Sequence, residues 1–199
     1  MTILRPIRED ELELIMNWRM MPEITKYMYT DPVLTLESQQ KWFHLLKERK
    51  DIIPFMIEVD GVPSGVLNIT DIDYTNKRCT WGYYVAVQEK RSLALAMALE
   101  WNLYDYVFDV MGLNKLEGEI FSFNKGVLRI HQMCGSQIEG VLKQHICKNG
   151  EFYDVTVTGI LKSDWEQIRG KYQYEKISFI LSEDYKEDEL KASLDYKTV

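Results

Sequence analysis

The clearest chemical signal in the sequence lies where an apolar strand passes through a short polar turn into an apolar helix, over residues 85–97. The first N–H groups of a helix have no acceptor within it and, together with the helix dipole, they attract anions. Lys90 and Arg91 add positive charge. Small side chains there would let a phosphate approach the backbone: Ser92, Ala94 and Ala96. The junction therefore predicts an anion site. The alternative interpretation is an ordinary strand-to-helix turn with no ligand, because the chain has neither of the two standard glycine-rich phosphate-binding motifs.

A second group of residues could bind or deprotonate a substrate. Arg19 precedes Pro22 on an amphipathic segment, where a guanidinium can hold a diphosphate through two hydrogen bonds; a surface ion pair is the alternative. Asp71 and Asp73 are two apart on a strand, so either could take a proton from an ammonium group; strand-end acids near a turn are the alternative. Seven aromatic residues could line a pocket or belong to the core: Trp18, Tyr27, Tyr29, Trp42, Trp81, Tyr83 and Tyr84.

The elements that must position these residues follow from the spacing of the apolar side chains. A period near 3.6 predicts helices early in the chain, and a change to period 2 predicts an antiparallel meander with a hairpin turn at Asp60-Gly61. Before the anion site we expect a strand at Thr2–Arg5, a helix over Asp10–Met20 that Pro22 limits, a helix from N-cap Thr35 through Leu46, and strands at Ile53–Val59, Val66–Tyr74 and Cys79–Val87.

The second half of the chain continues the alternation of helices and strands. We expect a long helix over Ser92–Val110 with Gly112 as C-cap, a strand at Leu116–Phe123, a helix over Lys125–Met133 with Asn124 as N-cap, a hairpin of Ser136–Cys147 and Phe152–Leu161 joined by Asn149-Gly150, and a helical turn at Trp165–Arg169. This order predicts an α/β (α+β) layer structure. We expect one domain over residues 1–170 and a charged C-terminal extension over 171–199, either peripheral or partly disordered.

The composition excludes several classes of protein. The chain has 199 residues, 46% of them hydrophobic, with 24 Lys and Arg against 31 Asp and Glu. A net charge of −7 argues against nucleic-acid binding through bulk charge. No apolar run approaches the roughly 20 residues that cross a bilayer, and the N-terminus lacks the apolar core of a signal peptide, so we expect a cytoplasmic protein. The 3 cysteines show no metal-ligand spacing, and we expect no metal.

Two motifs together resemble the GNAT superfamily of acyl-CoA-dependent N-acyltransferases, over about residues 1–165. The family's pyrophosphate signature, Arg/Gln-x-x-Gly-x-Gly/Ala, is similar to Arg91-Ser-Leu-Ala94-Leu-Ala96. Its later helix pattern, Asn-x-x-Ala-x-x-x-Tyr-x-x-x-Gly-Phe, aligns with residues 124–136. The resemblance implies a mixed, largely antiparallel central sheet flanked by helices, with two strands splayed apart at the acyl-CoA site. It also implies acetyl-CoA as the co-substrate.

The resemblance assigns roles to residues around that site. The pyrophosphate would contact Arg91, Ser92, Leu93, Ala94, Leu95 and Ala96. Val85 and Val87 would pair with the pantetheine arm, and the N–H of Val85 would face the thioester oxygen. Asn124 would bond the same arm in addition to capping its helix. His131 stands where many relatives have a tyrosine that protonates the departing thiolate, and an imidazolium can do this near neutral pH; an ordinary helix-face histidine is the alternative.

One position departs from the family pattern. Ala94 stands where relatives usually have a glycine. If the backbone there needs a positive φ, alanine costs about 1 kcal/mol and pushes a methyl group toward the phosphate; if φ is negative, the methyl is harmless.

The acceptor class follows from a narrower resemblance. Residues 17–22, 27–29, 40–43 and 149–155 are similar to N-acetyltransferases of the pseudaminic-acid pathway. This implies a UDP-4-amino-4,6-dideoxy sugar as acceptor. We expect Arg19, Tyr27, Met28 and Tyr83 to contact the substrate, and of the two strand acids we take Asp73 as the candidate base. The alternatives are a ribosomal-protein or peptide N-terminal acetyltransferase, or a non-catalytic module of the same fold. We expect a small-molecule substrate, no nucleic-acid or membrane partner, and a monomer or homodimer.

Overall fold

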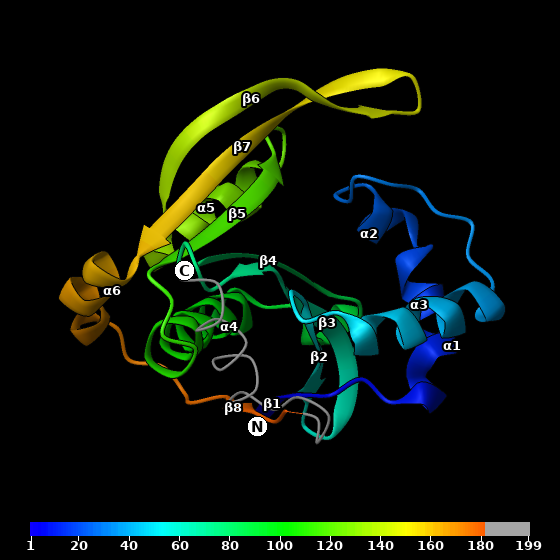
Figure 1. The fold of residues 1–199 in the computed structure, drawn as a ribbon, viewed down its shortest axis with the longest axis horizontal. Helices are drawn as coiled ribbons and strands as arrows, with labels where there is room; N and C mark the ends of the chain where they lie inside the picture. Colours follow the sequence, from blue (N-terminus) through cyan, green and yellow to red (C-terminus); the bar gives the residue numbers. More distant parts are fainter. Residues whose placement is uncertain (182–199) are drawn as a thin grey trace, which may run out of the picture.

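The structure is a computed structural model, which describes residues 1–181. A single mixed sheet lies at its centre (Figure 1). Its strand order is β6-β7-β5-β4-β3-β2-β1-β8. Adjacent strands are antiparallel except for two parallel pairs, β4 with β5 and β1 with β8. The strands are β1 (Thr2–Arg5), β2 (Ile53–Val59), β3 (Val62–Asp73), β4 (Arg78–Val85), β5 (Lys115–Phe121), β6 (Gln137–Lys148), β7 (Glu151–Leu161) and β8 (Ser178–Phe179). The predicted fold class is confirmed.

Helices cover the sheet in two groups (Figure 1). They are α1 (Leu12–Arg19), α2 (Pro22–Thr25), α3 (Leu36–Glu48), α4 (Leu93–Asp105), α5 (Lys125–Cys134) and α6 (Lys162–Ile168). Because side chains alternate across a strand, Met56 and Val66 pack with α1 and α3, whereas Phe55 and Leu67 pack with α4. Within residues 1–181, no helix combines the length and apolar character needed to cross a membrane.

Three local features differ from the predicted elements. Pro22 begins the short helix α2 as its first residue, a position that tolerates the missing N–H. The long helix ends in a π-helical turn, Tyr106–Val110, before Gly112 turns the chain with φ +68°. A register shift interrupts β3 between Thr70 and Asp73, and Asp71 has φ +49°. The simple alternation expected of Asp71 and Asp73 therefore does not apply.

The start of the predicted extension packs on the domain. The Tyr172 ring stacks on Trp101 with centroids 4.6 Å apart, and the Phe179 ring stacks on Tyr106 at 4.3 Å. Ile177 is buried, and β8 lengthens the sheet beside β1. Side chains of residues 172–181 therefore pack against the core of the domain, and Ile177 is part of that core. The rest of the predicted extension lies outside the described residues.

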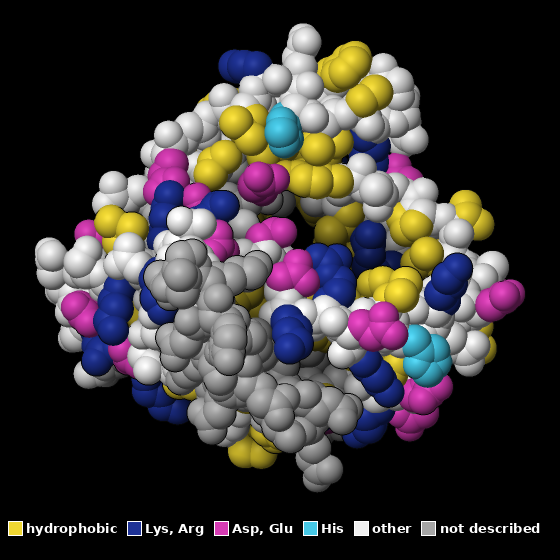
Figure 2. Space-filling model, viewed as in Figure 1, with side chains coloured by type: hydrophobic (Ala, Val, Ile, Leu, Met, Phe, Trp, Pro, Cys, Tyr) yellow, Lys and Arg dark blue, Asp and Glu magenta, His cyan; other side chains and the backbone are white. Residues whose placement is uncertain are grey.

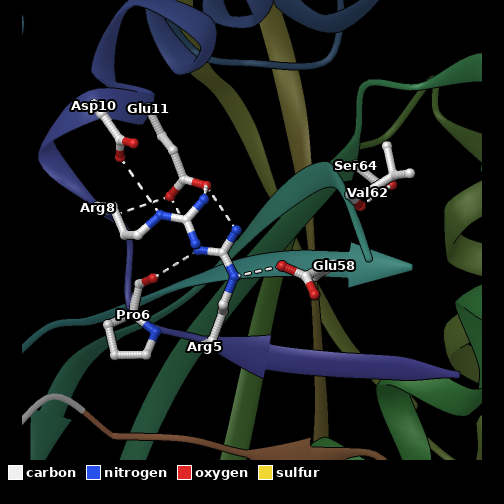
Figure 3. Close-up of polar contacts among 8 residues, drawn as sticks. All are labelled: Arg5, Pro6, Arg8, Asp10, Glu11, Glu58, Val62 and Ser64. Carbon is white, nitrogen blue, oxygen red and sulfur yellow. Dashed lines mark hydrogen bonds and ion pairs between the residues drawn. The ribbon is translucent and has the colours of Figure 1, made fainter. Parts of the chain in front are cut away.

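A buried ion-pair network ties the N-terminal strand to the first helical turn (Figure 3). The Arg5 guanidinium donates two hydrogen bonds to the carboxylate of Glu11, at 3.0 and 2.6 Å, and a third to Glu58 at 2.6 Å. The backbone and side chain of Arg8 also donate to Glu11. Both Arg5 and Glu11 are buried, so the bidentate geometry compensates two charges removed from water.

Candidate functional site

Two neighbouring strands at the centre of the sheet separate after a short paired segment. β4 and β5 pair only where Arg78–Thr80 faces Lys115–Glu117. Beyond that point β4 pairs with β3 and β5 pairs with β7, so the two strands diverge and each has an open backbone edge (Figure 1). Trp81 lies where they part, because a Cβ placed on Gly118 would be 3.5 Å from its Nε1. The predicted splay is therefore present.

The backbone of β4 presents one donor to this opening. The N–H of Ala86 donates to Ser64 O on β3 at 2.7 Å. Since successive N–H groups of a strand point in opposite directions, the N–H of Val85 points away from β3, toward the splay. Val87 differs, because its N–H also donates to Ser64 O, at 3.2 Å, and its carbonyl accepts from Lys90 N. Of the two valines predicted to bind pantetheine, only Val85 has a free N–H there.

The N-terminus of α4 lies just beyond this strand. Ser92 is the N-cap, and its Oγ accepts from Leu95 N at 3.0 Å. Ala96 N bonds Ser92 O, so the N–H groups of Leu93 and Ala94 are the helix donors without an intrahelical acceptor. Residues 91–94 are exposed. Ala94 is helical and does not have a positive φ, so its methyl group causes no backbone strain.

The Arg91 side chain folds back onto β4. Its Nε donates to Val85 O at 2.8 Å and its Nη2 donates to Ala86 O at 3.0 Å. The guanidinium therefore lies between the end of β4 and the start of α4, where phosphate oxygens would meet both the helix N–H groups and a cation. Lys90 is held by Asp60, with its Nζ 3.0 Å from Oδ2.

Helix α5 places Asn124 and His131 on the same side as α4. Asn124 is the N-cap, and its Oδ1 accepts from Val127 N at 3.4 Å. His131 is buried, with its ring against the edge of Trp81 at 5.2 Å between centroids. Its Nδ1 lies 3.0 Å from Oε1 of Glu100 on α4. Sequence reasoning missed Glu100, although a carboxylate in the middle of the most apolar helix is a signal that could have revealed it.

An open cavity of about 580 Å³ lies at the end of β5, between the end of α2 and the β6–β7 hairpin. Figure 2 shows a hollow on this face, with hydrophobic side chains on the hairpin above it. The cavity is lined by Pro22, Thr25, Lys26, Asp31, Phe121, Phe123, Lys148, Asn149 and Tyr153. Phe121 and Phe123 stack on each other at 5.0 Å, and the Tyr153 ring contacts both. Sequence reasoning missed these three rings, since the aromatic pattern considered only earlier segments.

The loop after α2 is held onto the hairpin tip. Lys148 Nζ donates to the carbonyl oxygens of Thr25 and Met28 at 2.6 and 2.9 Å and lies 2.9 Å from Asp31 Oδ1. Asn149 Nδ2 donates to the other Asp31 oxygen at 2.8 Å. Two hydrogen bonds from neighbouring residues thus fix the Asp31 carboxylate, and they lower its pKa.

The predicted acceptor residues are divided between two places. The Tyr27 ring lies 6.1 Å from that of Phe123 at the edge of the cavity, and Met28 contributes its carbonyl to the loop. Arg19 is not among the lining residues: its Nη2 contacts Thr30, and its buried Nη1 has no hydrogen-bond partner among residues 1–181. Tyr83 faces the α4 core, where its ring stacks on Trp81 at 5.6 Å.

Asp73 lies far from these residues. It pairs with Arg78 at the start of β4, and Val85 is seven residues further along, about 23 Å at the rise of a strand. Its carboxylate accepts from the side chain and backbone N–H of Asn76, and these bonds lower its pKa. Asp71 accepts from the Thr80 hydroxyl at 2.6 Å. The structure therefore does not bring the predicted base to the splay, and it gives Asp73 the role of a turn residue.

Comparison with known families identifies this arrangement. A family model described as acetyltransferase (GNAT) domain matches residues 2–137, more than half of the chain. The chain belongs to the GNAT acetyltransferase family. GNAT acetyltransferases use acetyl-CoA, and the chain is an acetyl-CoA-dependent N-acetyltransferase.

Several named acetyltransferases are similar to this chain. A spermidine N(1)-acetyltransferase of Escherichia coli is 24% identical over 153 residues, 75% of this chain and 80% of the relative. The acetyltransferase PseH of Campylobacter jejuni is 25% identical over 126 residues, 63% of this chain and 76% of the relative. A crystal structure of the Vibrio cholerae spermidine N-acetyltransferase with CoA and spermine has a TM-score of 0.77 at 20% identity, and covers 83% of this chain and 98% of its own. That likeness shows the fold.

For this GNAT enzyme, Arg91→Ala is expected to weaken acetyl-CoA binding. The variant removes a cation beside the α4 N-terminus, and hydrogen bonds to charged groups contribute about 1.5–3 kcal/mol, or roughly 10- to 150-fold in Kd. Isothermal titration calorimetry measures both proteins. Lys90→Ala is the matched control, because Lys90 is engaged by Asp60. Equal Kd values for wild type and Arg91→Ala would show that the Arg91 side chain does not contribute to pyrophosphate binding.

Proposed function

We propose that this GNAT enzyme transfers the acetyl group to the amine of a nucleotide-linked amino sugar, of the UDP-4-amino-4,6-dideoxy type. The observation that carries the proposal is the aromatic cavity beside the splay. Phe121, Phe123 and Tyr153 form a contiguous ring cluster along it, and stacking on such rings suits a nucleobase or a sugar face.

The charges around the cavity favour an anionic acceptor over a polyamine. A polyamine carries several positive charges and is bound best by unpaired carboxylates. The carboxylate in the cavity wall, Asp31, already bonds Lys148 and Asn149. Two lysines line the same wall, and Lys26 lies over the ring of Tyr27 at 5.4 Å, with no ion pair among residues 1–181. The resemblance of residues 17–22, 27–29, 40–43 and 149–155 to N-acetyltransferases of the pseudaminic-acid pathway supports the same acceptor class.

The co-substrate side has the groups that acetyl-CoA requires. We assign the free N–H groups of Leu93 and Ala94, with Arg91, to the pyrophosphate. The N–H of Val85 suits the thioester oxygen, where negative charge develops. Asn124, beside the splay, suits the pantetheine arm. The open edges of β4 and β5 supply the space that these contacts need.

The proton balance assigns one more role. The acceptor nitrogen forms a bond to the acetyl carbon, the carbon–sulfur bond breaks, and the sulfur leaves with the bonding electron pair. His131 gives a proton to that sulfur, the nitrogen loses a proton to water, and the imidazole regains its proton from solvent. Since Asp73 lies at the distant end of β4, we assign the deprotonation of the amine to water rather than to this carboxylate.

A thiol-release assay tests the acceptor. The enzyme is given acetyl-CoA with a UDP-4-amino-4,6-dideoxy sugar, with spermidine, or with a peptide that has a free N-terminus. We expect the highest kcat/KM for the nucleotide sugar and competitive inhibition by free UDP. A higher kcat/KM for spermidine or the peptide would overturn the proposed acceptor while the acetyltransferase activity stands.

Phe123→Ala is expected to raise KM for the nucleotide sugar by about 5- to 150-fold, because stacking on one ring contributes about 1–3 kcal/mol. The KM for acetyl-CoA should not change. Phe152→Ala is the matched control, since Phe152 is an exposed ring on the β6–β7 hairpin and does not line the cavity. An equal rise in both variants would show that the effect does not come from stacking in the cavity.

A further inference from the structure

A carboxylate that has no lysine or arginine partner among residues 1–181 lies in the core near the splay. Glu100 is fully buried on α4, at 0% exposure, among the apolar side chains of the main core. A buried carboxylate needs hydrogen bonds and a positive partner. Within residues 1–181, no lysine or arginine is paired with it, and the partner at ion-pair distance is Nδ1 of His131, 3.0 Å from Oε1. Glu100 and His131 therefore form a buried ion pair when the imidazole is protonated.

The geometry of the pair gives the two ring nitrogens different roles. Nδ1 is buried against Glu100, at hydrogen-bond distance but not yet in line for a good bond. Catalytic hydrogen bonds are often imperfectly aligned before substrates bind. Nε2 makes no hydrogen bond within the described residues, and the ring lies against Trp81, the side chain at the point where β4 and β5 part. Nε2 is therefore the nitrogen available to a group in the splay.

We propose that Glu100 is a positioning residue for His131: its carboxylate holds the proton on Nδ1, stabilises the imidazolium and so presents Nε2–H to the departing thiolate. This inference rests on the proton-donating role proposed for His131. It adds to that role the reason why a histidine can act where the family pattern has a tyrosine. The proton moves from Nε2 to sulfur, and Nδ1–H remains with Glu100.

The other titratable groups around Glu100 and His131 are uncharged, so Glu100 is the negative charge beside the imidazole. Tyr104, from the same helix, donates to Oε2 of Glu100 at 2.9 Å and contacts Ser136 Oγ at 3.1 Å. Burial raises the pKa of Tyr104, of Tyr83 on β4 and of the Cys134 thiol on α5, and the Glu100 charge raises each further. These three groups therefore stay protonated near neutral pH and add no negative charge beside His131.

The test titrates the thiol of coenzyme A bound to the protein, and so needs no acceptor. Thiolate absorbance is recorded against pH, relative to the same protein loaded with an analogue that lacks the sulfur. Loss of the Glu100 charge acts in two opposite directions. Its direct effect favours the thiolate and moves the ionisation to lower pH. Its effect through His131 weakens the imidazolium that pairs with the thiolate and moves the ionisation to higher pH.

We expect Glu100→Gln to move this ionisation upward by about 1 pH unit or more, as loss of a charge partner does. His131→Asn should move it upward at least as far. Asp105→Asn should leave it unchanged, because Asp105 is on the same helix but bonds Trp165, Tyr174 and Lys176. No shift or a downward shift in Glu100→Gln, with an upward shift in His131→Asn, would overturn the role of Glu100 alone. No shift in His131→Asn would overturn the proposed role of His131, and the inference with it.

Nitrogen-15 NMR of the wild-type imidazole gives a second measurement that does not depend on a folded variant. If Glu100 holds the Nδ1 proton, the neutral ring carries its proton on Nδ1, and Nε2 is the nitrogen that titrates. A neutral ring protonated on Nε2 would contradict the proposal.

Discussion

His131→Asn is expected to lower kcat by about 100- to 10,000-fold, the range of a lost general acid, while the Kd for acetyl-CoA changes little. Without the imidazolium the sulfur must leave as an unprotonated thiolate, whereas the groups that hold the pyrophosphate are unaffected. Stopped-flow thiol release, with the acceptor preferred in the assay above, measures kcat, and calorimetry measures Kd. Asparagine is polar and smaller than the ring, so the buried site keeps a hydrogen-bond partner for Glu100.

A second substitution and a distant histidine control this experiment. His131→Tyr introduces the residue of the family pattern and should recover part of the activity. His44→Asn, in α3 and away from the splay, should retain wild-type kcat. A kcat for His131→Asn within threefold of wild type would contradict the role of His131, provided that circular dichroism shows an unchanged fold.

Glu11→Ala is expected to lower the free energy of unfolding by about 3 kcal/mol. Removing one partner of a buried ion pair typically costs about 3–5 kcal/mol, because the other charge stays buried without compensation. The low end applies here, since Glu58 still accepts a hydrogen bond from Arg5. Denaturant unfolding measures the change. Asp10→Ala is the matched control: its pair with Arg8 is exposed, so a change within about 0.5 kcal/mol is expected.

From the Glu11 carboxylate we also predict how acid destabilises the fold. Burial raises the pKa of Glu11, but hydrogen bonds from Arg5 and Arg8 outweigh it and the net pKa is lowered. A lowered pKa adds stability that is fully present above the unfolded-state pKa of about 4.3 and is lost as the pH falls through the folded-state value. Wild type should therefore lose stability more steeply than Glu11→Gln between about pH 5 and the folded-state pKa. Parallel slopes would contradict this account.

Local sequence signals predicted most elements because their causes lie within a few residues. Asp60-Gly61 and Asn149-Gly150 adopt the positive φ angles that tight hairpin turns need. Ser92 and Asn124 cap their helices with their own side chains. Tertiary contacts changed what local rules predict. The register shift in β3 removed the shared face expected of Asp71 and Asp73, and side chains after residue 171 pack against the core.

The family motifs also predicted the reaction class, because each motif is a short, continuous segment of the sequence. The tertiary structure decided the rest. The splay depends on where β4 stops pairing with β5, the cavity joins residues near positions 25, 121 and 150, and Glu100 meets His131 across two helices. These contacts join segments far apart in the chain. Packing and strand register determine which segments meet, and the periodicity within one segment carries no information about either.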